Sequence, residues 1–92
     1  MKISSTLLAL VPSVFLSTSV LASPDCTKEP KDKWKDQKEF EKSLKDEGYK
    51  IKKFKVSGNC YEIYGWNKDG KKVEIYFNPV TGAIVKQEVE GK

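Results

Sequence analysis

The sequence contains no histidine and no arginine, and only two cysteines stand among its 92 residues. Without histidine, the chain lacks the base of Ser-His and Cys-His catalytic pairs and the imidazole ligand of many metal sites. Without arginine, it lacks the planar group that binds phosphate or carboxylate through two parallel hydrogen bonds. Two thiols cannot form a four-thiolate zinc site. We therefore expect no enzyme activity, no cofactor and no metal site.

Carboxylates are the remaining groups with acid–base chemistry. Solvation of a helix or strand surface explains them better than catalysis does. A calcium site at residues 67–70 would lack a full set of oxygen ligands, and that segment reads as a turn. The carboxylates considered for catalysis are Glu39, Glu62, Asp69 and Glu74.

The N-terminal segment has the pattern of a secretory signal. Lys2 gives a basic start, an uncharged apolar run covers residues 7–21, and small residues precede a cut after Ala22. The alternative is a membrane anchor, but the run is shorter than the ~20 residues of a spanning helix and Pro12 interrupts it. We expect a signal peptide over residues 1–22, a periplasmic or secreted protein, and no membrane span after cleavage.

The two cysteines favour a structural disulfide between Cys26 and Cys60. Export delivers the chain to an oxidising compartment, and two thiols permit a single intramolecular pairing. The alternative is a reactive thiol pair, but no C-x-x-C motif is present. Such a bridge suits a domain of this size, whose hydrophobic core alone is marginal.

The remainder divides into a polar, extended lead-in over residues 23–33, which carries Cys26, and one domain over residues 34–92. From about residue 34 to residue 47 the apolar residues Trp34, Phe40 and Leu44 fall near one face of a helix. Asp36 is the expected N-cap, and Gly48 is expected to follow the helix C-terminus. The apolar stripe is thin, so this helix needs a sheet to pack on.

After the helix, short alternating segments separated by turn residues predict an antiparallel sheet. The alternation changes parity at Lys52-Lys53, which predicts a β-bulge. Gly58-Asn59 is a two-residue hairpin turn, and a three-residue loop at residues 68–70 joins the next pair. The expected strands cover residues 49–56, 61–66, 72–77 and 83–89. The fold class is therefore α+β: one N-terminal helix packed on one face of a four-stranded (at minimum three-stranded) meander.

The turns fix the strand register. The first turn places Val56 opposite Tyr61 and Phe54 opposite Ile63, and the next loop places Ile63 opposite Ile75. Both turns then put the same set of apolar residues on one face. In the fourth strand, either Ala83 and Val85 or Ile84 could face the helix. The set on the common face is Phe54, Val56, Tyr61, Ile63, Val73, Ile75 and Phe77.

The opposite face carries the rows Lys55–Glu62–Tyr76 and Lys53–Tyr64–Glu74, with Trp66 and Lys72 beyond. One interpretation is a solvated face with cross-strand charge pairs. The other is an aromatic partner-binding face rimmed by lysine. Cys60 shares the parity of Glu62, so the lead-in must reach this face or the hairpin tip and could cover part of it. The candidate partner-binding residues are Lys53, Lys55, Tyr64, Trp66 and Tyr76.

Three stretches resemble the PepSY family, especially its small exported members: Gly48-Tyr49-x-Ile51, Cys60-Tyr61-Glu62-Ile63-Tyr64, and the run from Gly70 to Gly82 that ends in Asn78-Pro79-Val80-Thr81-Gly82. The resemblance covers about residues 26–89. The family usually has Asp where this chain has Asn78, and Asn can cap the same turn through its side-chain oxygen.

The resemblance implies an exported helix-plus-sheet module of the kind found in propeptides of secreted metallopeptidases. Its motif is structural, so it transfers no catalytic residue. We expect a non-enzymatic exported binding module whose protein partner is a peptidase or another envelope protein.

The alternative function is binding to an anionic surface, lipid or cell-wall polymer, through lysines at positions 50, 52, 53 and 55. The net charge is only +4, because 13 acidic residues are interleaved with 17 lysines. The same interleaving, together with export, disfavours nucleic-acid binding. The oligomeric state is left open.

Overall fold

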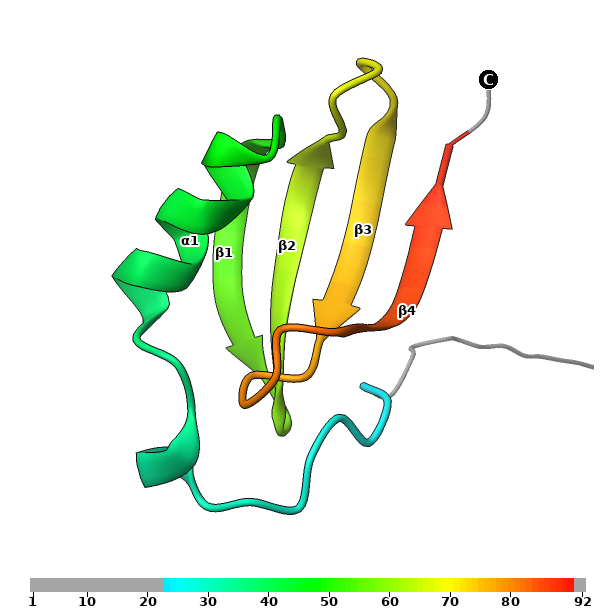
Figure 1. The fold of residues 1–92 in the computed structure, drawn as a ribbon. Helices are drawn as coiled ribbons and strands as arrows, with labels where there is room; N and C mark the ends of the chain where they lie inside the picture. The colour runs from blue at the N-terminus through cyan, green and yellow to red at the C-terminus, as the bar shows by residue number, and fades with distance from the viewer. Residues whose placement is uncertain (1–22, 91–92) are drawn as a thin grey trace, which may run out of the picture.

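The computed structural model describes residues 23–90 of the chain. The predicted signal peptide, residues 1–22, lies outside the described residues. A short 3-10 turn and one α-helix precede a four-stranded antiparallel sheet with the spatial order β1-β2-β3-β4. The α+β class is confirmed (Figure 1). The elements are η1 Lys31–Lys33, α1 Gln37–Asp46, β1 Lys50–Ser57, β2 Cys60–Trp66, β3 Lys72–Phe77 and β4 Ile84–Val89.

Helix α1 begins and ends on local signals. The Asp36 carboxylate accepts a hydrogen bond from the backbone N–H of Glu39 at 3.1 Å, which confirms the predicted N-cap. At the other end, Gly48 has a φ of 108°, and the N–H of Tyr49 bonds the carbonyl of Leu44 at 3.1 Å. This backbone arrangement closes the helix by satisfying its last carbonyl groups.

The prediction that the helix begins near Trp34 is wrong. Asp36 has extended backbone angles, so the chain before Gln37 cannot continue the helix. Trp34 instead follows η1, and its indole N–H donates to the Glu29 carbonyl at 3.2 Å. Its ring meets the ring of Tyr61 edge-on, with centroids 5.5 Å apart. Trp34 therefore packs beside the core from the short segment that precedes the helix.

The strand register is confirmed in both predicted hairpins. Val56 pairs with Tyr61 across the first turn, and Ile63 pairs with Ile75 across β2 and β3. The register of β1 shifts between Ile51 and Lys53, where the bulge was predicted. In the loop before β4, the Asn78 side chain accepts from the N–H of Val80 at 2.8 Å, so Asn78 caps this turn as expected.

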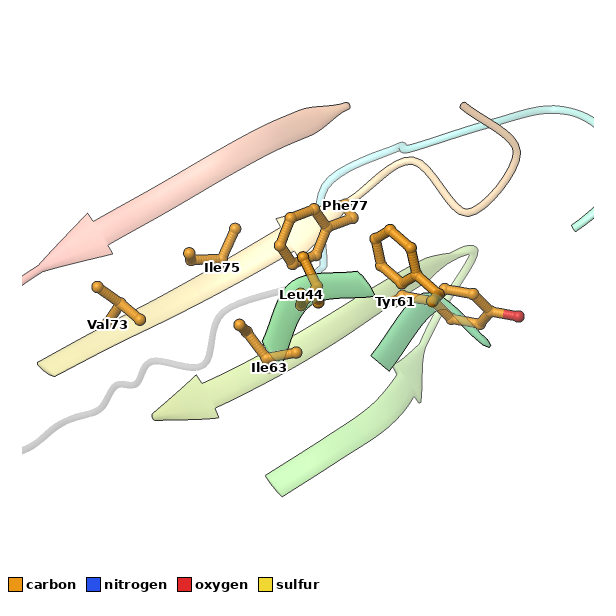
Figure 2. Packing of buried hydrophobic residues seen from close by; sticks show 7 residues of the cluster. Leu44, Tyr61, Ile63, Val73, Ile75 and Phe77 are labelled. Atoms are coloured by element: carbon orange, nitrogen blue, oxygen red, sulfur yellow. The ribbon is translucent and has the colours of Figure 1, made fainter. Parts of the chain in front are cut away.

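The hydrophobic core lies between α1 and the inner face of the sheet, where the side chains shown in Figure 2 come together. The ring of Phe40 lies 5.1 Å from Phe77 and 5.6 Å from Tyr61, centroid to centroid. Val56 has the predicted parity, but it is 37 % exposed because β1 is an edge strand. The buried members are Phe40, Leu44, Tyr61, Ile63, Val73, Ile75 and Phe77.

Neither expectation for a buried residue in the fourth strand holds. Ile84 pairs with Phe77 but is 45 % exposed, and every residue of β4 is exposed. Helix α1 lies toward β1 and β2, whereas β4 forms the far edge of the sheet (Figure 1). One helix about 10 Å wide covers only about two strand spacings of ~4.8 Å. The inner side of β4 is therefore left uncovered.

Gly65 is required by close backbone approach beside the bulge. A Cβ at this position would overlap the carbonyl oxygen of Lys50. We predict that Gly65→Ala lowers the free energy of unfolding by about 1–3 kcal/mol, because rigid backbone must move to relieve the overlap. Urea titration followed by circular dichroism measures the effect.

Gly70→Asn is the matched control. Gly70 has a φ of 80° with open space around its Cβ position, and Asn tolerates left-handed backbone. Its effect should stay within about 0.5 kcal/mol. Equal unfolding midpoints for the two variants would show that the approach at Gly65 is unimportant.

Candidate functional site

The disulfide Cys26–Cys60 joins the lead-in to the start of β2, with 5.2 Å between the two Cα atoms. Both half-cystines are buried, and they form a cluster with Tyr76 on the outer face of the sheet, opposite α1. Tyr76 is only 8 % exposed as a result. The lead-in therefore covers one end of the outer face.

Asn59 anchors the lead-in on both sides of Cys26. Its Oδ1 accepts from the N–H of Cys26 at 2.8 Å, and its Nδ2 donates to the Thr27 carbonyl at 2.7 Å and to Asp25 at 2.8 Å. From the sequence, Asn59 is predicted only as a turn residue. The signal that could have revealed this role is an amide side chain directly before a bridged cysteine.

Glu62 is buried on the outer face, with 1 % of its surface exposed. Its Oε1 lies 3.9 Å from the ammonium nitrogen of Lys55. Its Oε2 is buried without a hydrogen-bond partner among the described residues. The interpretation of this row as a solvated charge ladder is therefore wrong at Glu62, because neighbouring side chains exclude water from the carboxyl group.

The surroundings of the two central carboxyl groups shift their pKa values in opposite directions. Burial raises the pKa of Glu62 above its ordinary value of 4.5, and the adjacent Glu74 carboxyl raises it further. The pKa of Glu74 is lowered, mainly by the Glu62 carboxyl and also by the hydroxyls of Tyr64 and Tyr76. The Tyr76 hydroxyl donates to Glu74 Oε2 at 3.2 Å. Glu74 thus carries the negative charge and Glu62 retains a proton to higher pH.

An open hollow of about 520 Å³ occupies the other end of the outer face. Half-buried Tyr64 and Trp66 of β2 line it, and the ammonium group of Lys55 lies 5.7 Å from the centre of the Tyr64 ring. The charges on its two sides are mainly of opposite sign. Lysines of β1 lie on one side, and the carboxylates of β3 and the β4 end lie on the other together with Lys72 of β3: Lys52, Lys53 and Lys55 against Glu74, Glu88 and Glu90.

The hollow brings together four of the five residues named from the sequence: Lys53, Lys55, Tyr64 and Trp66. Tyr76 lies apart from them, packed against the disulfide. Parity placed all five on one face, but parity does not show which end of that face the lead-in covers.

Within residues 23–90, no helix is long and apolar enough to cross a membrane. The same residues contain no cluster of three or more metal-ligating His, Cys, Asp or Glu side chains.

These features define a small disulfide-bridged α+β domain that presents an open, aromatic-lined hollow on the face opposite its helix. The family model described as peptidase propeptide and YPEB domain matches residues 5–88, and the chain belongs to this family, the PepSY family. Domains of this family are propeptide-like modules and generally non-catalytic. Searches among curated proteins and among solved structures gave no match.

The buried carboxyl group predicts a pH dependence of stability. Because the pKa of Glu62 is raised in the folded chain, the folded state binds more protons than the unfolded state above pH 4.5. The contribution of Glu62 is therefore full below 4.5 and is lost as pH rises through its folded pKa. The lowered pKa of Glu74 has the opposite effect, which is felt below pH 4.5.

We expect Glu62→Gln to remove the decline in unfolding free energy between pH 4.5 and neutral pH, because the amide keeps the shape and cannot ionise. Urea unfolding at a series of pH values measures this slope. Glu88→Gln, on the same face but exposed, should leave the slope in place. A decline that persists in Glu62→Gln would assign it to another group.

The disulfide gives a further prediction. Cys26→Ser combined with Cys60→Ser should lower the free energy of unfolding by about 3–4 kcal/mol, because it opens a loop spanning 34 residues of sequence separation. Urea unfolding measures the loss. Wild type treated with reductant should lose a similar amount, and unchanged stability in both samples would show that the lead-in is held by its hydrogen bonds alone.

Proposed function

We propose that this protein is an exported, non-enzymatic module that binds a protein partner through the hollow and thereby modulates a peptidase or another envelope protein. The proposed modulation of a peptidase rests on family membership. A bridged disulfide is consistent with the export that we propose, to the periplasm or to the exterior. The signal peptide over residues 1–22 is part of this proposal.

The observation that carries the proposal is the gathering of Tyr64, Trp66, Lys53 and Lys55 around one open hollow. Half-buried aromatic side chains supply most of the binding energy in many interfaces, because they offer large rigid surfaces at low entropic cost. The two charged sides add orientation. A bound segment with an acidic group near β1 and a basic group near β4 would meet complementary charge on both sides.

The alternative partner is an anionic surface. Lys50, Lys52 and Lys53 are exposed, and within residues 23–90 the ion pairs recorded for β1 lysines involve Lys55 alone. Binding to anionic vesicles that disappears at high salt, with no dependence on Tyr64 or Trp66, would favour this alternative. Protein binding should instead depend on both aromatic residues.

The test begins with a photo-crosslinking amino acid at position 66 in cells that export the full-length protein. Crosslinking at position 38, on the exposed surface of α1, is the matched control. Captured proteins are identified by mass spectrometry, and a captured peptidase is then assayed with and without the purified module. A partner captured equally from both positions would contradict the assignment of the hollow.

We predict that Tyr64→Ala combined with Trp66→Ala weakens binding to the captured partner by about tenfold to a hundredfold, because two aromatic contacts are lost. Calorimetry or surface plasmon resonance measures the dissociation constant. Lys38→Ala combined with Lys42→Ala, on the exposed side of α1, should leave it unchanged. Circular dichroism confirms that each variant is folded.

A further inference from the structure

Strand β4 is an open edge with exposed apolar side chains. Val85 and Val89 are 41 % and 45 % exposed, and Ile84 is 45 % exposed. In the part of the chain that the structure describes, three of the four exposed large hydrophobic residues belong to this strand. No strand pairs with the outer side of β4, which ends the sheet of the described residues. An edge of this kind can accept a further strand.

The two edges of the sheet differ in charge pattern. β1 carries lysine at positions 50, 52, 53 and 55, so a second positive strand would be repelled there. β4 carries one charge of each sign, Lys86 and Glu88, on either side of Gln87. An antiparallel copy of β4 centred on Gln87 would therefore place opposite charges across from each other.

The backbone of β4 has the matching hydrogen-bond phase. The N–H of Glu90 donates to the Lys72 carbonyl of β3 at 2.9 Å. In an antiparallel ladder, alternate residues direct their backbone groups to opposite sides. Pairing with β3 is regular over Lys86–Val89, so Gln87 and Val89 direct theirs toward the open edge. A symmetric partner strand would form its backbone hydrogen bonds with these groups.

We propose that two copies of this chain pair through β4, antiparallel, with Gln87 on the two-fold axis. In this register Lys86 of each copy lies opposite Glu88 of the other, and Val85 lies opposite Val89. The two Gln87 residues exchange backbone hydrogen bonds, and both sheets continue as one. The inference uses the backbone edge of β4 rather than Tyr64 and Trp66, and of the charged pair it invokes only Glu88 also lines the hollow.

Substitutions that reverse single charges on this strand test the register. The full-length gene is expressed, and the protein is purified in the form that the cell releases. Sedimentation equilibrium should give twice the chain mass for the wild type at concentrations up to about 1 mM, a range that detects weak association. Lys86→Glu and Glu88→Lys should each give the mass of one chain, because each places like charges across the pairing. An equimolar mixture of the two variants should recover the doubled mass, since the charges are then opposite.

Lys38→Glu on α1 makes the same charge change away from the edge and should remain dimeric. Thermal unfolding by circular dichroism verifies that each variant is folded, which matters because Lys86 lies near Glu74. The combined variant Lys86→Glu with Glu88→Lys should also be dimeric. A monomeric wild type over the whole range would overturn the proposal. So would dimers that persist in both single variants, or a mixture that stays monomeric.

Discussion

The structure depends on the burial of four consecutive residues of β2, from Cys60 to Ile63, on the two faces of the sheet. Tyr61 and Ile63 point to the helix and form the centre of the core. Cys60 and Glu62 point the other way, where the disulfide and neighbouring side chains cover them. A one-residue slip of this strand would exchange the two sets, placing a carboxylate in the core and removing the cysteine from its partner. The register of β2 thus fixes the helix side and the disulfide side together.

Local signals made most of this fold predictable. Gly58-Asn59 and the loop ending at Gly70 fix strand offsets by length alone, and Asp36 and Gly48 mark the helix ends by side-chain and backbone chemistry. The start of the helix was misplaced because Trp34 has helical spacing but precedes the cap. For the site, parity placed Tyr64 and Trp66 on one face, but the burial of Tyr76 and Glu62 depends on the long-range path of the lead-in, which no local pattern encodes.

The two ends of the outer face differ in what covers them. At the hairpin end, the bridge at Cys26 and the hydrogen bonds of Asn59 hold the lead-in against Tyr76, so that end belongs to the stability of the domain. At the other end, β1 and β4 contribute opposite charges around the aromatic floor. Glu62 and Glu74 lie between the two regions, and their opposite pKa shifts make this boundary sensitive to acid. A partner that seats a cation near Glu74 would favour its ionised form further, so binding in the hollow would release protons at acidic pH.

The small size of the domain also explains why its last strand is exposed. One ten-residue helix covers the inner face only across the strands nearest to it, and the aromatic ring of Phe40 reaches Phe77 of β3 but leaves β4 bare. Lengthening the helix would not help, because the uncovered area lies to its side. A second helix would cover the inner face of β4, whereas the proposed pairing with a second copy would satisfy the open edge of β4 with no additional sequence. The alternation of Lys86, Gln87 and Glu88 suits the latter solution, because the same three residues serve as both halves of the contact.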